Sequence, residues 1–388
     1  MARINLIKSS FYNEKETKEK LCSFIMDAKK LSMGEECKKF EKKFSKFQNR
    51  KYSIFVTSGG AANLILIQSL MNMGKIKKGT RVGVSALTWS TNIMPLIQLG
   101  LIPVLIDCEI NTMNVSLNKI KEKNISALFL TNALGFCSDI DKIKEYCEKN
   151  NILFIEDNCE SLGSEYKGIK LGNFGIASTF SFFVGHHLST IEGGMICTDN
   201  EKLYQNLLIS RIHGWSRNLP IKSQNKLKWE NGVNDFYNKY TFYDLAYNVR
   251  PGEINGFIGN EQMNYVEEII TKREENFKKI NEAIKRNKDI IDLDIKNINR
   301  ISNFGVPLIF KNKKLFEKYL KRFEEANVEV RPIISGNVAN QPFFKKYCKL
   351  NNNTSFPNAE FIHKNGFYCG NNPEMNEIEI NFIINLLK

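Results

Sequence analysis

Short β-branched runs alternate with helical stretches between residues 54 and 200, and this alternation constrains the fold more than any other feature. The expected strands are 54–57, 81–85, 102–107, 127–132, 152–157 and 178–183. Helical stretches such as 61–73 and 139–150 lie between most of them. The pattern predicts a mostly parallel sheet with helices on both faces. Ligands of such sheets bind beyond the carboxyl ends of the strands.

The rest of the chain is expected to contribute more helix and a second sheet. Residues 1–50 read as amphipathic helix, and 214–240 as a long polar loop. A long helix is expected over about 260–288, followed by strands near 305–309 and 328–332 and a closing helix over 375–388. We therefore expect a large domain over 1–249, including the N-terminal helical segment, and a smaller C-terminal α/β domain over 250–388.

Composition excludes several classes of protein. The chain has 388 residues, 42% of them hydrophobic and 25% charged, which is ordinary for a globular protein. It shows no apolar run long enough for a membrane span or a signal peptide, so we expect a cytoplasmic protein. The net charge of +13 comes largely from lysines mixed with glutamates, the pattern of solvated helix faces. We expect no nucleic acid partner, although a positive field would attract a diphosphate-bearing substrate.

The nine cysteines are scattered, and no Cys-x-x-Cys pair occurs. This spacing indicates neither a disulfide framework nor a zinc site, so free thiols in a reducing compartment are expected. A [2Fe–2S] centre needs clustered cysteines. The chain has no cysteine between Cys197 and Cys348, and we therefore expect no iron–sulfur cluster.

Three predicted strand ends carry candidate ligand-binding residues. Ser58 and Gly59 follow the first strand and open a helix, where backbone N–H groups can bind a phosphate. Trp89 follows the second strand and could stack on a flat ring. Asp157 ends a buried apolar strand, where a carboxylate is costly unless it is paired. Each feature has a structural explanation when taken alone, as a turn, a core residue or a cap.

The segment 180–194, Phe-Ser-Phe-Phe-Val-Gly-His-His-Leu-Ser-Thr-Ile-Glu-Gly-Gly, makes the combination specific. It resembles the cofactor-lysine loop of the DegT/StrS-type nucleotide-sugar aminotransferases, which use pyridoxal 5′-phosphate (PLP). In that family a lysine stands five residues after the serine. Here Ser181 is followed at that spacing by His186. An imidazole cannot form a Schiff base with the cofactor, but it can transfer protons near neutral pH.

The resemblance covers nearly the whole chain and implies a PLP-dependent transferase of fold type I, with a mostly parallel seven-stranded sheet. It implies a set of cofactor-binding residues, which bind the phosphate, stack on the ring, pair with the pyridine nitrogen or lie beside the cofactor. These residues are Ser58, Gly59, Trp89, Asp157, Glu160, Ser181 and Asn248. Glu160 departs from the glutamine usual in the aminotransferases. Asn248 would reach the phosphate of a partner subunit, which implies a homodimer with sites at the interface.

Substrate contacts implied by the resemblance are His213, Arg250 and Arg331. The pattern around His186 is similar to the branch of the family that dehydrates GDP-4-keto-6-deoxy-D-mannose at C3. That branch implies L-glutamate as the amino donor, which converts PLP to pyridoxamine phosphate (PMP). His186 would then act as the catalytic base while the C3 hydroxyl leaves. The substrate would be a GDP-4-keto-6-deoxy sugar, a mannose or a related heptose, on the route to 3,6-dideoxy sugars of surface polysaccharide.

Three alternatives differ from this hypothesis. An iron–sulfur-dependent dehydrase with a reductase partner is rejected on the cysteine pattern. Ordinary amino transfer would need another lysine, and Lys167 and Lys170 lie in a predicted turn outside the motif. A non-catalytic regulator that binds PLP or a nucleotide sugar belongs to a different class and would show no turnover with glutamate. His187, next to His186, is given no catalytic role because neighbouring side chains point in different directions.

Overall fold

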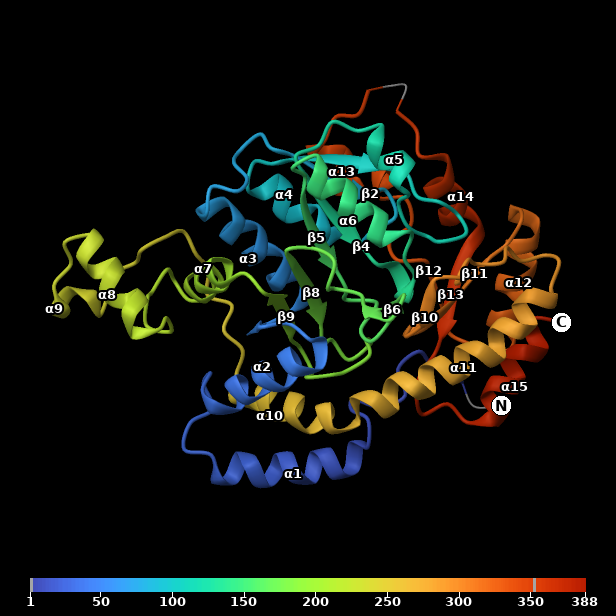
Figure 1. The fold of residues 1–388 in the computed structure, drawn as a ribbon. Helices are drawn as coiled ribbons and strands as arrows, with labels where there is room; N and C mark the ends of the chain where they lie inside the picture. Colours follow the sequence, from blue (N-terminus) through green and yellow to red (C-terminus); the bar gives the residue numbers. More distant parts are fainter. Residues whose placement is uncertain (1–2, 352–353) are drawn as a thin grey trace.

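The computed structural model describes residues 3–351 and 354–388 (Figure 1). Its largest sheet has seven strands in the order β1-β9-β8-β5-β4-β2-β3. They are β1 (Tyr52–Val56), β2 (Arg81–Ser85), β3 (Ile102–Ile106), β4 (Ala127–Thr131), β5 (Leu153–Asp157), β8 (Ala177–Ser181) and β9 (Gly194–Thr198). Only β9 runs antiparallel to its neighbours. The predicted fold class, with a mostly parallel seven-stranded sheet, is therefore confirmed.

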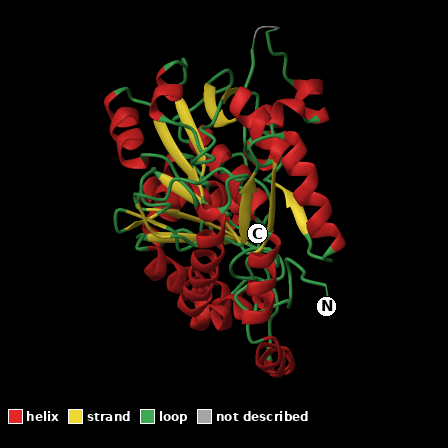
Figure 2. Ribbon diagram, turned by 90° about the vertical axis from the view of Figure 1, so that its right-hand side faces the viewer, coloured by secondary structure: helices red, strands yellow, loops and turns green. Residues whose placement is uncertain are grey.

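Helices lie on both sides of the strands (Figure 2). The strand interiors are buried because apolar side chains on both faces pack against these helices. In chain order the α-helices are α1 (Glu14–Asp27), α2 (Glu35–Gln48), α3 (Gly59–Asn72), α4 (Met94–Gln98), α5 (Leu117–Lys121), α6 (Ile140–Lys149), α7 (Glu201–Arg211), α8 (Ile221–Glu230), α9 (Asp235–Asn238), α10 (Glu253–Gln262), α11 (Val266–Arg286), α12 (Lys313–Glu325), α13 (Pro342–Tyr347), α14 (Pro357–Asn365) and α15 (Glu377–Leu386).

Two smaller sheets complete the fold. β11 (Gly305–Ile309), β13 (Gly366–Gly370) and β12 (Val330–Pro332) form an antiparallel sheet in the C-terminal part. β6 (Glu165–Tyr166), β7 (Ile169–Lys170) and β10 (Ile298–Arg300) form the other, and β10 joins the C-terminal part to the N-terminal part. The domain boundary at 249/250 stays a prediction.

The structure differs from the sequence-based expectations in several places. Four strands of the two smaller sheets, β6, β7, β10 and β13, were not predicted. β9 was not predicted, although it pairs with both β1 and β8. The segment expected to be a loop over 214–240 contains α8 and α9; α8 has no buried residue, so it lacks the apolar stripe by which a helix is recognised. The single helix expected over 260–288 is divided into α10 and α11 by a short 3-10 turn at Met263–Tyr265.

The segment that contains α8 and α9 projects away from the rest of the chain (Figure 1). It carries large exposed hydrophobic side chains, among them Trp229 (83% exposed), Phe236 (73%) and Tyr240 (72%). We call residues 221–245 the arm. In the described part of the chain, no helix is both long enough and apolar enough to span a membrane.

Candidate active site

Ser58 and Gly59 lie at the start of α3, at the carboxyl end of β1. Ser58 is the N-cap of α3, and its Oγ accepts a hydrogen bond of 3.0 Å from the N–H of Ala61. A Cβ added at Gly59 would lie 2.8 Å from Cβ of Ser181 and 3.0 Å from Sγ of Cys159. The absence of a side chain therefore allows the helix start to approach Ser181. The first N–H groups of the helix and the two serine hydroxyls form a small anion-binding cradle.

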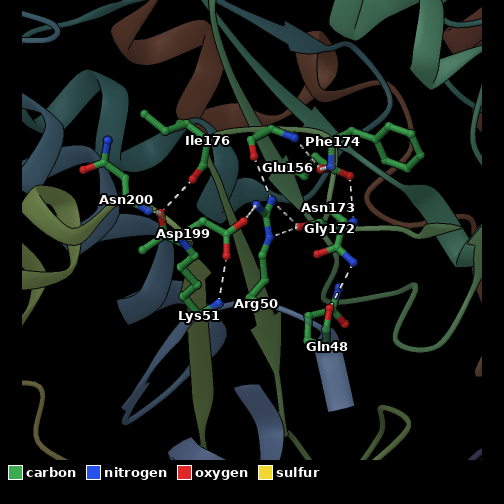
Figure 3. A network of polar contacts seen from close by, with 12 residues as sticks. Gln48, Arg50, Lys51, Glu156, Gly172, Asn173, Phe174, Ile176, Asp199 and Asn200 are labelled. Atoms are coloured by element: carbon green, nitrogen blue, oxygen red, sulfur yellow. Dashed lines mark hydrogen bonds and ion pairs between the residues drawn. The ribbon is translucent and has the colours of Figure 1, made fainter. Parts of the chain in front are cut away.

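The two adjacent carboxylates at the end of β5 point to opposite faces of the sheet, as strand alternation requires. Glu156 is fully buried and accepts hydrogen bonds from the N–H groups of Gly172 (2.8 Å), Phe174 (2.7 Å) and Gly175 (2.8 Å). Figure 3 shows this network, in which Arg50 also donates to the carbonyl oxygen of Gly172. Burial raises the pKa of Glu156, and the network gives it a structural role.

Asp157 points the other way, toward the start of α3. Its Oδ2 accepts hydrogen bonds from the side-chain amides of Asn63 (3.0 Å) and Asn92 (2.7 Å), and its Oδ1 accepts one from the N–H of Cys159 (2.9 Å). A carboxylate offers about four lone-pair sites, so one acceptor site remains after these three bonds. Asp157 is thus held rigidly as a carboxylate that can still pair with one protonated nitrogen.

His186 lies in the loop after β8 and lines a cavity of about 140 Å³. Trp89, Glu160 and Arg331 line the same cavity, so the structure brings four of the predicted residues together. Trp89 is 52% exposed, which leaves one face of the indole available to a ligand. Arg331 forms an ion pair with Glu329 at 2.8 Å. Phe304 and Tyr368, which also line the cavity, were not predicted, because nothing in their local sequence distinguishes them from core residues.

The imidazole of His186 is in its neutral form at pH 7. Burial is the main cause and lowers its pKa to about 4; the carboxylate of Asp157 and a hydrogen bond to the backbone of Ser181 oppose this effect, and the charge of Arg273 adds a smaller lowering. We expected a value near 6.5 from the sequence, and the difference is due to desolvation.

Glu160 is the second titratable group in the cavity. Its Oε2 accepts a hydrogen bond of 3.0 Å from the N–H of Leu134. Burial raises the pKa of Glu160 to about 7, and the negative charge of Asp157 adds to the rise. The carboxyl group therefore carries a proton in part of the molecules at neutral pH, so that it can donate as well as accept a hydrogen bond.

His187 is directed away from this cavity. Its Nε2 lies 3.1 Å from the carbonyl oxygen of Ser302, and its side chain is 4% exposed. Burial lowers the pKa of His187. These contacts explain the residue as a packing element.

Asn248 and Arg250 line a second cavity, of about 470 Å³, which is separate from the one at His186. Nε of Arg250 donates to Oδ1 of Asn248 at 2.9 Å. The ring of His213 packs beside this cavity, against Trp215, with a centroid separation of 4.9 Å. Trp215 and two further basic residues, Lys30 and Arg217, line it as well. None of the three was predicted: Trp215 and Arg217 lie in the segment 214–240, which reads as an ordinary polar loop, and Lys30 lies in the N-terminal helical segment among other lysines.

The residues around His186 fit a PLP molecule. The side chain of Ser181 and the N-terminus of α3 lie close together because Gly59 has no Cβ, and Asp157 keeps one free acceptor site for a pyridine nitrogen. The exposed indole of Trp89 suits the ring. Among the described residues, no cluster of histidine, cysteine and carboxylate side chains could bind a metal ion.

Known proteins resemble this chain over nearly its whole length. The profile of the DegT/DnrJ/EryC1/StrS aminotransferase family matches residues 12–388. Over 372 residues the chain is 35% identical to the GDP-4-keto-6-deoxy-D-mannose 3-dehydratase of Escherichia coli O55:H7, covering 94% of this chain and 95% of that one. The crystal structure of an E. coli enzyme of that name with bound hydrated PLP superposes with a TM-score of 0.91, at 34% identity, with both chains covered completely.

A further structure of a GDP-4-keto-6-deoxymannose-3-dehydratase contains a trapped PLP-glutamate geminal diamine. It has a TM-score of 0.89 to this chain at 33% identity and covers 99% of this chain and 100% of its own.

Proposed function

The chain belongs to the DegT/DnrJ/EryC1/StrS aminotransferase family, and on this premise we propose that it is a PLP-dependent 3-dehydratase of a GDP-4-keto-6-deoxy sugar. It uses L-glutamate as the amino donor and removes the C3 hydroxyl of a mannose or a related heptose. The product is a 3-deoxy-4-keto sugar, a precursor of the 3,6-dideoxy sugars of surface polysaccharide.

The observation that carries this proposal is His186 in the position of the Schiff-base lysine. Among the described residues that line the cavity at His186, none is a lysine. A covalent link between the chain and the cofactor requires a primary amine, which an imidazole does not provide. The site is therefore suited to proton transfer and elimination rather than to ordinary amino transfer.

When bound, PLP supplies an electron sink for charge that develops on the substrate. We assign Asp157 to its pyridine nitrogen and Trp89 to the face of its ring. Ser58, Gly59 and Ser181 hold its phosphate. Glu160 is the polar neighbour of the cofactor.

His186 is the residue that transfers a proton during the elimination of the C3 hydroxyl. Its pKa of about 4 leaves the imidazole neutral at pH 7, so that a ring nitrogen can accept a proton at the start of the elimination. The same nitrogen can pass the proton to the departing C3 hydroxyl.

A homodimer completes the site in this proposal. The cavity with Asn248 and Arg250 is separate from the one with His186, so within one chain these predicted ligands do not meet. The family resemblance places Asn248 at the phosphate of the partner's cofactor. The arm carries exposed aromatic side chains, and an interface with a second copy of the chain would bury them.

The basic second cavity suits the diphosphate of the substrate. Lys30, Arg217 and Arg250 place three positive charges around it, and guanidinium groups bind phosphate oxygens well. We assign His213 and Arg331 to substrate contacts as well. The protein would work in the cytoplasm, where nucleotide sugars are made, without an iron–sulfur cluster and without a reductase partner.

Mass spectrometry tests the proposal directly. The protein is incubated with PLP, L-glutamate and GDP-4-keto-6-deoxymannose. The expected product is a nucleotide sugar lighter by one oxygen atom, with 2-oxoglutarate and ammonia released. A ketone oxygen replaced by an amine would identify an aminotransferase instead. The absence of both sugar turnover and 2-oxoglutarate would favour a non-catalytic regulator. 2-Oxoglutarate with an unchanged sugar would exclude this hexose and direct the assay to a heptose.

A further inference from the structure

We propose that Arg273 is a positioning residue for His186: its guanidinium fixes the backbone of the residue that carries the catalytic imidazole. The inference rests on the proposed role of His186. Arg273 lies on α11, far from the motif in sequence. It is not among the residues that line the cavity with Trp89 and Glu160.

Arg273 is a buried cation, 4% exposed. Nη2 donates a hydrogen bond of 3.1 Å to the carbonyl oxygen of His186, and Nη1 donates to the carbonyl oxygen of Asn371. Within the described residues no carboxylate pairs with it, and burial alone lowers its pKa to about 9. A buried charge without a counter-ion is costly. The two backbone carbonyls are therefore the partners that determine where this guanidinium lies.

The planar guanidinium joins two chain segments at once. One is the loop that carries His186, and the other is the end of β13. Asn371 returns the contact, because its side-chain amide donates to the carbonyl oxygens of Arg273 (2.9 Å) and Asn303 (3.0 Å). Arg273 thus ties the loop to a support that is itself held by reciprocal hydrogen bonds.

The imidazole of His186 depends on this support. Its Nδ1 has no hydrogen-bond partner among the described residues. Its ring is held by the rings of Phe304 and Phe183, with centroid separations of 5.1 and 5.9 Å. Its direction is thus set by aromatic packing and by the backbone, whose carbonyl oxygen Arg273 binds. A displacement of a reacting group by about 1 Å can reduce a rate about 100-fold.

The charge of Arg273 also acts on the imidazole. Burial is the largest cause of the lowered pKa of His186; the carboxylate of Asp157 and a hydrogen bond to the backbone of Ser181 oppose it, and the charge of Arg273 adds the smallest of these effects, a further lowering. The other titratable residues that line the two cavities at His186 are Tyr12, Glu160, His187, Arg331, Tyr368 and Glu374. Arg273 therefore helps to keep His186 in the form that accepts a proton.

Two substitutions separate the hydrogen bond from the charge. Arg273→Lys keeps the charge but loses the planar two-pronged geometry, so kcat should fall about tenfold while KM and the acid limb of the pH–rate profile stay in place. Arg273→Gln keeps a donor for the carbonyl oxygen of His186 but loses the charge. Its acid limb should move to higher pH by about one unit, because removing a nearby positive charge raises the pKa of the imidazole.

Asn276→Ala is the matched control. Asn276 lies on the same helix and donates to the carbonyl oxygen of Asn372 at 3.1 Å, next to the carbonyl that Arg273 binds, but it makes no hydrogen bond to His186. This variant should lower the melting temperature and leave the acid limb unmoved. If the acid limb of the pH–rate profile shifted as much in Asn276→Ala as in Arg273→Gln, the effect of Arg273 would be a general structural one. That result would overturn the inference.

A readout without catalysis keeps the inference separate from the proposed function. The chain has four histidines, so their ring signals can be followed by NMR titration of the full-length protein, and the signal absent from His186→Asn identifies His186. Its pKa should rise in Arg273→Gln and stay constant in Arg273→Lys and Asn276→Ala. An unchanged titration in Arg273→Gln would overturn the electrostatic part, even if dehydration by the wild-type protein is established. A shifted titration in a protein that does not dehydrate would refute the proposed function alone.

Discussion

The backbone N–H of Leu134 donates a hydrogen bond of 3.0 Å to Oε2 of Glu160 from a left-handed conformation, with φ of 46°. A non-glycine residue in this region costs on the order of 1 kcal/mol or more. The chain is therefore strained where it supports the carboxyl group that lies beside the proposed cofactor site.

Glu160→Gln should make the stability of the protein less dependent on pH. The folded-state pKa of about 7 lies above the ordinary 4.5, so the contribution of the protonated carboxyl is complete below pH 4.5 and is lost as the pH rises through 7. Glutamine keeps an oxygen for Leu134 and cannot ionise. The variant should match the wild type near pH 4.5 and exceed it by about 1–3 kcal/mol at about pH 8. Urea unfolding at both pH values measures this, and a difference independent of pH would contradict it.

Asp157→Asn should weaken cofactor binding. The asparagine would lack the charge that pairs with a protonated pyridine nitrogen, and its amide would face the donor groups of Asn63 and Asn92. We expect a loss of PLP affinity of about 100-fold, equivalent to about 2.7 kcal/mol, measured by spectroscopic titration with PLP.

Glu156→Gln is the control on the opposite face of the sheet. It would place an amide N–H₂ against backbone N–H donors such as that of Phe174, and should lower the free energy of unfolding by about 1–3 kcal/mol. PLP affinity should be unchanged. The reverse pattern, with PLP affinity kept in Asp157→Asn and lost in Glu156→Gln, would exclude the assignment of the two carboxylates.

His186→Asn should abolish dehydration and leave PLP binding largely intact. Asparagine cannot act as a base, and loss of a general base costs about 100- to 10,000-fold in rate. The measurements are kcat for sugar dehydration and PLP affinity in the same preparation. Dehydration at the wild-type rate in this variant would rule out His186 as the base.

Gly59→Ala should lower PLP affinity because the new Cβ would lie 2.8 Å from Cβ of Ser181, inside the phosphate cradle. Gly60→Ala is the matched control at the next position, where the closest contact of the Cβ would be a methyl group of Thr91 at 3.1 Å, with Oγ of Ser58 at 3.8 Å. We expect at least a tenfold difference in PLP affinity between the two variants, about 1.4 kcal/mol. Equal affinities would place the phosphate elsewhere.

Polar substitutions in the arm should weaken the homodimer. Trp229→Ser and Phe236→Ser remove two side chains that are 83% and 73% exposed in the single chain and bury little there. The folded monomer should therefore keep its melting temperature. Analytical ultracentrifugation should show a wild-type dimer and a shift toward monomer in the double variant. A wild-type monomer with full activity would refute the shared active site.

The sequence alone determined the parts of this protein that depend on local chemistry. Six of the seven main strands were predicted to within about two residues, because a strand buried on both faces is a continuous apolar run. Ser58, Asp157 and His186 are assigned to the site from the family resemblance, and the short motifs that carry this resemblance are local to the chain. β9 escaped prediction, although it lies in the middle of the sheet.

Only the tertiary structure decided what surrounds His186. Arg273 comes from α11 and Tyr368 from β13, and no periodicity in either element marks a residue that will pack against a loop far away in the sequence. The same holds for the pKa of His186, since desolvation depends on all the segments that exclude water from the ring. Residue type and spacing thus determine which chemistry is available, while long-range packing determines its geometry and protonation.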